Sequence, residues 1–295
     1  MPWIQSRRVR IGVGVAIAVA LLGLAALATP AHSQDWPNRF VVGATITQPQ
    51  KEAPIFINTV RAESPAGRAG ITSGSRLLAV DGVQVIDLRE AAKRMSSDKS
   101  GSVTLRLWRR GQTYEVTLER EKMSSVLRRT GKKITPQGLI VPLDATQADV
   151  ERLTRFDPGR IEARAFPEHV PLDPDVFCAG FEVFILRESR QIMVGGLEAG
   201  PGERAGLRWG DLILAIDEVD PKEKTATEIE AMLSGDHPRA IHLKIERLGT
   251  IKTVEFTLEK NSQVLKQNQR QLIKGKLVPA GLADEDLKWF ISEHK

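Results

Sequence analysis

The sequence contains very little cysteine and few residues that could hold a metal. Its 295 residues include one cysteine, Cys178, and five histidines. A single thiol cannot form an internal disulfide, so no such cross-link supports this fold. The neighbours of Cys178 in the sequence are apolar, which favours a buried side chain over a reactive or intermolecular thiol. Paired cysteines and a His-Glu-x-x-His motif are both missing, and we expect neither a metal nor a cofactor.

A strong net charge is also missing once the amino terminus is set aside. Arg7, Arg8 and Arg10 precede an apolar run, residues 11–28, and small residues follow up to Ser33. This order predicts an export signal at residues 1–33, cleaved near its end, for a periplasmic or envelope protein. An uncleaved membrane anchor is the alternative, because the run is at the short end of a spanning helix. Without these three arginines the formal charge falls from +5 to +2, which gives no support to nucleic-acid binding.

What the sequence does have is a long internal repeat. Residues 64–71 (SPAGRAGI) return as residues 200–207 (GPGERAGL), and the similarity continues to Val83 and Val219 at the same spacing of 136 residues. A unit of this length can bury its own core, so we predict two duplicated domains.

Each unit is predicted to contain several strands and one main helix. Residues 87–97 carry apolar side chains three and four residues apart, as an amphipathic helix does, and residues 226–234 repeat them in the second unit. The fold class is therefore α+β, mainly β with helices, as two partly open β-barrels, each followed by a short strand-helix tail. The predicted strands of the first unit include residues 55–60, 77–80, 103–107 and 114–118.

Each domain is followed by a basic tail, and a proline-rich stretch predicted to be a stiff linker joins the two halves. The basic residues form either a solvated face or a contact with an anionic surface of the cell envelope. The last helix, around Phe290, is too short to be stable alone and should pack on its own domain or on the other one. The predicted boundaries are 38–120 and 177–260 for the domains, 121–156 and 261–295 for the tails, and 157–176 for the linker. The basic residues are Lys122, Arg128, Arg129, Lys132 and Lys133, then Lys260, Lys266, Arg270, Lys274 and Lys276.

The repeated motif resembles a PDZ domain, and more specifically the PDZ modules of bacterial HtrA/Deg-like envelope proteases. It consists of Ser-Pro-Ala-x-x-Ala-Gly-Ile, a further glycine, and an apolar strand that ends in Val80-Asp81-Gly82. Two positions depart from the pattern. Ser75 replaces the acidic residue that the second copy keeps as Asp211, and Glu218 replaces the glycine expected after Asp217.

The resemblance implies a peptide site in each domain. An open strand edge pairs with an extended peptide, and the backbone N–H groups of a glycine-containing loop receive a terminal carboxylate. The alternative is that each loop is only the entry to a strand, and some of the helix side chains must face the core. A bulky side chain at Gly43 or Gly180 is expected to close the loop without disturbing the fold. The implied site residues are Val42, Gly43, Ala44, Thr45, Ala92 and Met95 in the first domain, and Ala179, Gly180, Phe181, Glu182, Ile229 and Leu233 in the second.

Two functions follow from these observations. The first is an exported, non-catalytic adaptor, regulator or chaperone that binds protein C-termini or unfolded, extended segments. The second is a structural component that docks on one fixed partner, such as a separately encoded envelope protease or an assembly complex. HtrA-like proteins usually carry a protease domain before the first PDZ module, and none is expected here. Ser96-x-x-Lys99 matches a serine–lysine acylation pattern by chance, because its usual accompanying motif is missing.

Overall fold

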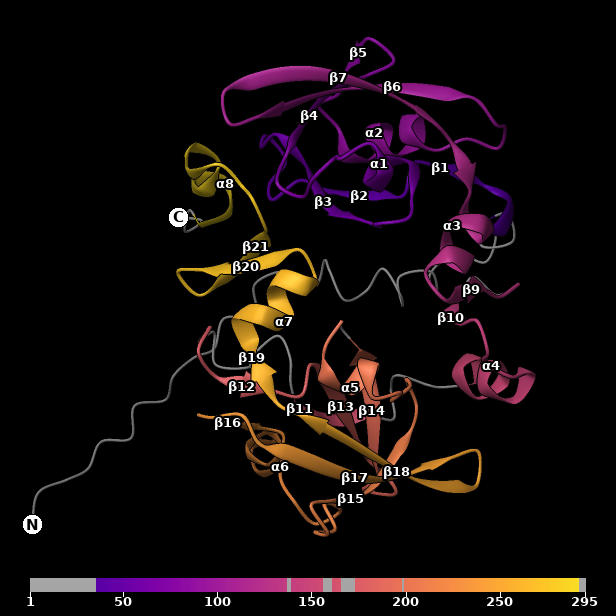
Figure 1. The fold of residues 1–295 in the computed structure, drawn as a ribbon, viewed down its shortest axis with the longest axis vertical. Helices are drawn as coiled ribbons and strands as arrows, with labels where there is room; N and C mark the ends of the chain where they lie inside the picture. Colours follow the sequence, from indigo (N-terminus) through magenta and orange to yellow (C-terminus); the bar gives the residue numbers. More distant parts are fainter. Residues whose placement is uncertain (1–35, 137–138, 156–160, 166–172, 198, 292–295) are drawn as a thin grey trace, which may run out of the picture.

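The computed structural model describes residues 36–136, 139–155, 161–165, 173–197 and 199–291. They form two domains of similar architecture at opposite ends of the molecule (Figure 1). Each domain is mainly β with short helices on an open antiparallel sheet, so the predicted α+β fold class is confirmed. The predicted export signal, residues 1–33, lies outside the described residues.

The first domain is built on one antiparallel sheet with strand order β2-β3-β4-β6-β7, in which β5 pairs with β4. β1 lies outside this sheet and pairs with β8. Helix α1 follows β3, and α2 lies between β5 and β6. The bounds are η3 Trp36–Asn38, β1 Phe40–Val41, β2 Ala44–Thr47, β3 Ile55–Val60, α1 Pro65–Arg68, β4 Arg76–Val80, β5 Val83–Gln84, α2 Leu88–Met95, β6 Ser102–Arg109, β7 Gln112–Glu119 and β8 Glu121–Lys122.

The second domain repeats this arrangement, with strand order β11-β13-β14-β15-β17-β18. β12 lies apart and pairs with both β16 and β19. The bounds are β11 Ile161–Ala165, β12 Phe177–Cys178, β13 Phe181–Leu186, β14 Ile192–Leu197, α5 Pro201–Arg204, β15 Leu212–Ile216, α6 Ala226–Met232, β16 Ser234–Gly235, β17 Ala240–Arg247, β18 Thr250–Thr257 and β19 Glu259–Lys260.

Strand β11 differs from the prediction. It comes from the segment 157–176, predicted to be a linker, yet it pairs antiparallel with β13 at the edge of the second sheet. No strand described in the first domain corresponds to it. Pro158 and Pro167 flank a stretch without proline, so these residues can donate and accept the hydrogen bonds of a sheet. The unpaired groups of an edge strand favour such pairing.

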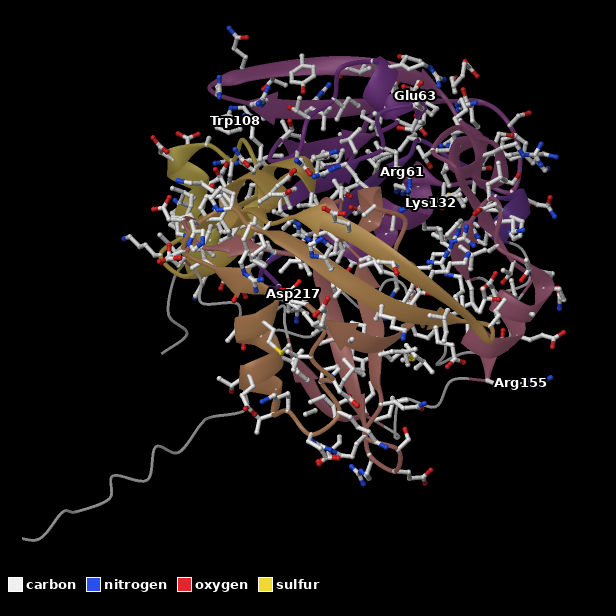
Figure 2. All side chains as sticks on the ribbon, turned by 60° about the horizontal axis from the view of Figure 1, so that its bottom comes forward. Arg61, Glu63, Trp108, Lys132, Arg155 and Asp217 are labelled. Atoms are coloured by element: carbon white, nitrogen blue, oxygen red, sulfur yellow. The ribbon has the colours of Figure 1, made fainter. Side chains whose placement is uncertain are left out.

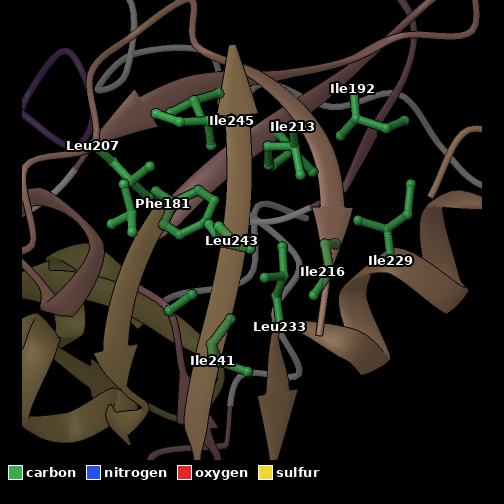
Figure 3. Close-up of a cluster of buried hydrophobic side chains, with 14 of the residues drawn as sticks. Phe181, Ile192, Leu207, Ile213, Ile216, Ile229, Leu233, Ile241, Leu243 and Ile245 are labelled. Carbon is green, nitrogen blue, oxygen red and sulfur yellow. The ribbon is translucent and has the colours of Figure 1, made fainter. Parts of the chain in front are cut away.

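Alternating apolar side chains build each core. In β17, Ile241, Leu243 and Ile245 are fully buried, while the residues between them are more exposed. Helix α6 covers this face of the sheet, and Figure 3 shows Ile229 on the helix facing the strands. Leu233 follows one turn later and is also fully buried. The first domain uses Ala91 and Met95 of α2 in the same way.

The departure at Ser75 has an electrostatic consequence. In the second domain, Nε and Nη2 of Arg247 each donate to Asp211 at 2.7 Å, and these hydrogen bonds raise the pKa of Arg247. Arg109 ends the equivalent strand of the first domain, where Ser75 replaces the aspartate. Its buried Nε accordingly has no hydrogen-bond partner. The two domains therefore share a fold but not this buried ion pair.

Each tail is a helix, a hairpin and a second helix, and so contains more elements than the predicted strand and helix. The first helix of each tail packs on its own domain, where Arg129 of α3 pairs with Glu121 and Asn268 accepts from the Ala199 N–H at 3.0 Å. The bounds are α3 Met123–Arg129, β9 Lys132–Ile134, β10 Ile140–Pro142 and α4 Gln147–Thr154, then α7 Asn261–Gln267, β20 Arg270–Ile273, β21 Lys276–Pro279, η5 Asp284–Asp286 and α8 Leu287–Ile291.

The remainder of each tail crosses to the other domain. In the C-terminal tail, Phe290 of α8 packs against Phe56 of β3 with ring centroids 5.1 Å apart, and Val278 and Leu282 join the same buried cluster. This tail lies beside the first domain in Figure 1. Of the two packing modes predicted for this helix, contact with the other domain is the one that the structure adopts.

The first tail contacts the second domain mainly through charges. Nζ of Lys132, labelled in Figure 2, lies 3.3 Å from Glu203, and Arg208 pairs with Asp144. Several predicted basic residues therefore already have partners inside the protein, including Arg129 with Glu121 and Lys260 with Asp175. This internal pairing reduces the charge left for an anionic surface.

Candidate peptide sites

Candidate site 1 is the loop at Gly43, the edge strand β2 and the helix α2. Gly43 has a φ of +78°, a conformation that favours glycine. Two hydrogen bonds hold the carbonyl groups of the loop. Ala66 N–H donates to Val42 O and Arg61 N–H donates to Gly43 O, both at 2.9 Å. These bonds orient the loop toward the start of β2.

Candidate site 2 is the loop at Gly180, strand β13 and helix α6, and its loop has the same geometry. Gly180 has a φ of +72°, and Gly202 N–H donates to Ala179 O at 3.1 Å. Ala179 N–H also donates to Leu233 O at 3.2 Å, which ties the loop to the end of α6. Phe181 and Glu182 follow the loop on β13 and are both buried, Phe181 within the core.

The two glycines differ in the space around them, and the expectation for Gly43 is wrong. A Cβ at Gly43 would lie 2.1 Å from the Ser64 Cβ, whereas one at Gly180 would lie 3.0 Å from the Gly200 Cα. Ser64 caps α1, since its Oγ accepts from Gly67 N–H at 3.2 Å. A side chain at Gly43 therefore disturbs the fold as well as the loop.

We expect Gly43→Ala to lower the free energy of unfolding by about 3 kcal/mol and Gly180→Ala by about 1 kcal/mol. Both substitutions add left-handed strain, but the 2.1 Å contact with Ser64 forces a much larger displacement than the 3.0 Å contact with Gly200. Urea denaturation of the two variants measures the difference. Equal losses would mean that the contact with Ser64 relaxes without cost.

The helix residues divide between core and surface. Met95, Ile229 and Leu233 are buried in the cores, whereas Ala92 is exposed on α2. The helix N-caps, Asp87 and Thr225, give the structural alignment of the two helices, because each side chain accepts an N–H three residues later. With the caps aligned, Met95 corresponds to Leu233, but Ala92 corresponds to Glu230 rather than to Ile229. The loop before α6 is longer than the loop before α2, so the repeat spacing of 136 residues does not hold for the two helices.

One polar side chain spans the far end of each site, and the sequence analysis singled out neither of the two. Nε2 of Gln48, just after β2, donates to Ile86 O at 3.1 Å in the loop before α2. In the second domain, Nη2 of Arg190 donates to Lys224 O at 3.2 Å in the loop before α6. Each side chain thus links the end of the strand that follows the glycine loop to the loop before the helix. Their sequence signal is weak, since Gln48 and Arg190 do not occupy matching repeat positions.

The strand edges of the two sites differ. β2 is the terminal strand of the first sheet, and within the described residues its only strand partner is β3. β13 is not terminal, because β11 pairs with it on the side opposite β14. Ala44 and Thr45 therefore lie on a free edge, whereas Phe181 and Glu182 begin a strand whose edge is already covered further along.

Comparison with known proteins identifies the two domains. The model of the PDZ domain matches residues 56–109 and 194–247, one segment in each domain. The chain contains two PDZ domains. Both matched segments run from the second strand after the glycine loop, β3 or β14, to the end of the first hairpin strand, β6 or β17, and so include α2 and α6.

The curated relatives are proteases, and the similarity lies in their PDZ regions. Over 74 residues the chain is 32% identical to a "Probable periplasmic serine endoprotease DegP-like" of Bartonella henselae, covering 25% of this chain and 15% of the relative. Over 106 residues it is 35% identical to a "Carboxyl-terminal-processing protease" of Synechocystis sp., covering 36% and 22%. The matches thus span about a fifth or less of each relative's length.

Two solved structures give the same kind of partial likeness. A photosystem II D1 C-terminal processing protease is 24% identical with a TM-score of 0.29, covering 34% of this chain and 26% of its own. The HtrA-type protease AlgW with decapeptide is 22% identical with a TM-score of 0.26, covering 28% and 29%. In the part of the chain that the structure describes, no helix is long and apolar enough to cross a membrane.

Proposed function

We propose that the protein is an exported, non-catalytic peptide-binding protein, and that site 1 receives C-termini or extended segments of other proteins. The free edge of β2 carries this proposal, because an extended peptide can add to it as a further strand. Apolar side chains that are only partly buried line both sides, with Ala44 and Ile46 on β2 and Leu88 on α2. The Gly43 loop at the start of β2 is suited to a terminal carboxylate.

The cellular role rests on different support. The basic and apolar order of residues 1–33 favours export, and one relative is named periplasmic. An adaptor, regulator or chaperone in the envelope would use site 1 to hold its client. A separately encoded envelope protease is a partner of the right kind, since the relatives carry their PDZ regions within one chain with the protease.

A single substitution on α2 tests site 1. We expect peptides with an apolar C-terminal residue to bind the wild-type protein with a Kd of about micromolar. Ala92→Phe should weaken this binding at least about tenfold. The exposed Ala92 shares a helix face with Leu88, so a large ring there would fill the space beside β2. Fluorescence anisotropy with the full chain measures the affinity.

Lys93→Phe is the matched control, because it places the same ring on the next exposed residue of α2. It should leave affinity unchanged. A C-terminally amidated peptide should bind more weakly than the free acid if the loop receives a carboxylate. Equal affinities for both forms leave only strand pairing, and equal effects of the two Phe variants remove site 1 from the proposal.

A further inference from the structure

Strand β11 lies on β13 as a peptide ligand would lie on a PDZ domain. The pairing is antiparallel, with Ile161 opposite Leu186 and Ala165 opposite Val183. The chain of β11 therefore runs toward the start of β13, where the Gly180 loop lies. An extended segment approaching that loop with its C-terminal end is the orientation expected for the proposed mode of binding.

The side chains of β11 fill the space between strand and helix. Ala163 packs against the core cluster that contains Ile229 and Leu233, and β11 contacts α6 directly. A register shift between Ile161 and Ala163 turns Ile161 to the other face of the sheet, where it packs against Phe184. Both faces of this short strand are thus in contact with the second domain.

A charged contact holds the outer face. Nη1 of Arg190 donates to Glu162 at 3.1 Å, while Nη2 of the same guanidinium donates to Lys224 O at the loop before α6. Glu162 is exposed, and an exposed ion pair of this kind contributes little to stability. β11 is therefore fixed in orientation by many contacts but held by few buried side chains.

We propose that residues 161–165 are a ligand in cis, which occupies site 2 until an external segment displaces it. Site 2 then takes internal, extended segments with a small side chain facing the helix, and it needs no terminal carboxylate because the bound chain continues past Ala165. The inference rests on the proposed strand-pairing mode but concerns a different site from site 1.

Tethering makes a weak ligand effective. A segment on a short tether has an effective concentration of about 1 mM. If its intrinsic Kd is about 0.1 mM, the site is closed about ten times as often as it is open, and an external ligand binds about tenfold more weakly than to an empty site. Removing the cis ligand should restore that factor.

The test uses the full chain and a fluorescent synthetic peptide that copies residues 159–167. We expect Ala163→Asp to bind this peptide about tenfold more tightly than the wild type, because a carboxylate facing the core expels β11. Glu162→Asp is the control, since it places the same side chain one residue away on the exposed side. It should bind the peptide as the wild type does.

Hydrogen exchange in the wild-type chain supplies a measurement that needs no variant. A copy of the peptide that carries heavy isotopes but no fluorophore, added in excess, should speed exchange in residues 161–165 while residues 181–186 stay protected. Unchanged exchange in residues 161–165, or equal peptide affinity of wild type and Ala163→Asp, overturns the proposal. The site 1 peptide serves as an independent readout, because Ala163→Asp should not alter its affinity.

Discussion

Ending the chain after Asn268 is expected to destabilise the first PDZ domain, although that domain ends about 150 residues earlier in the sequence. The truncation uncovers Phe56, which is fully buried beneath Phe290, Val278 and Leu282. It also removes Gln269, whose side chain accepts from Val60 N–H at 2.7 Å. We expect a loss of about 5 kcal/mol from the first domain, from the apolar surface exposed and the bonds lost.

Hydrogen exchange shows which of the two domains the truncation destabilises. Exchange in β6 should accelerate strongly, while exchange in β17 of the second domain should change little. Asn268 is retained because it caps α7 and bonds to Ala199. A chain that ends after Ile291 is the control and should behave as the full chain does. Faster exchange confined to β17 would show that the tail supports its own domain instead.

Arg76→Met should produce the second large effect, a loss of about 4 kcal/mol at pH 8. Asp286 is fully buried in the docked tail, and Nε of Arg76 donates to it at 2.6 Å. Arg76 also stacks on Trp108, on the side of the first domain that faces this tail (Figure 2). The substitution keeps the apolar stem but leaves a buried carboxylate without its cation, and Oδ2 of Asp286 has no partner even in the wild type.

The loss should depend on pH. Burial raises the pKa of Asp286 above its ordinary value of 3.8, although the hydrogen bond from Arg76 acts to lower it. Removing Arg76 therefore raises this pKa further. A raised pKa in the folded state contributes stability below the unfolded pKa, and this contribution is lost as pH rises through the folded value. Arg76→Met should therefore be more stable at pH 5 than at pH 8, relative to the wild type.

Urea denaturation at the two pH values measures this dependence. Asp286→Asn is the matched control, because it removes the charge that needs a partner and leaves Arg76 on Trp108, partly in water. It should cost about 1 kcal/mol with little dependence on pH. Equal losses in both variants would mean that the tail docks through its apolar contacts alone.

Much of this protein could be predicted from its sequence. The repeat and the alternation in residues such as Ile241, Leu243 and Ile245 are local signals that predicted two domains of α+β fold, and the repeated motif added the resemblance to PDZ modules. The resemblance to PDZ modules then pointed to the two glycine loops, at Gly43 and Gly180. The three- and four-residue spacing of apolar side chains placed Ala92 on a helix.

What covers each domain could not be predicted from the sequence. Phe56 and Met193 occupy equivalent strands, yet the C-terminal tail buries Phe56 whereas Met193 packs in a cluster that includes Ile161 of β11. The pairing of β11 with β13 joins residues 18 to 25 positions apart, and the ion pair of Arg76 with Asp286 joins residues 210 positions apart. No local pattern of hydrophobicity or turn residues encodes which distant surface an edge strand or a short helix will meet, because that depends on the shapes of domains already folded.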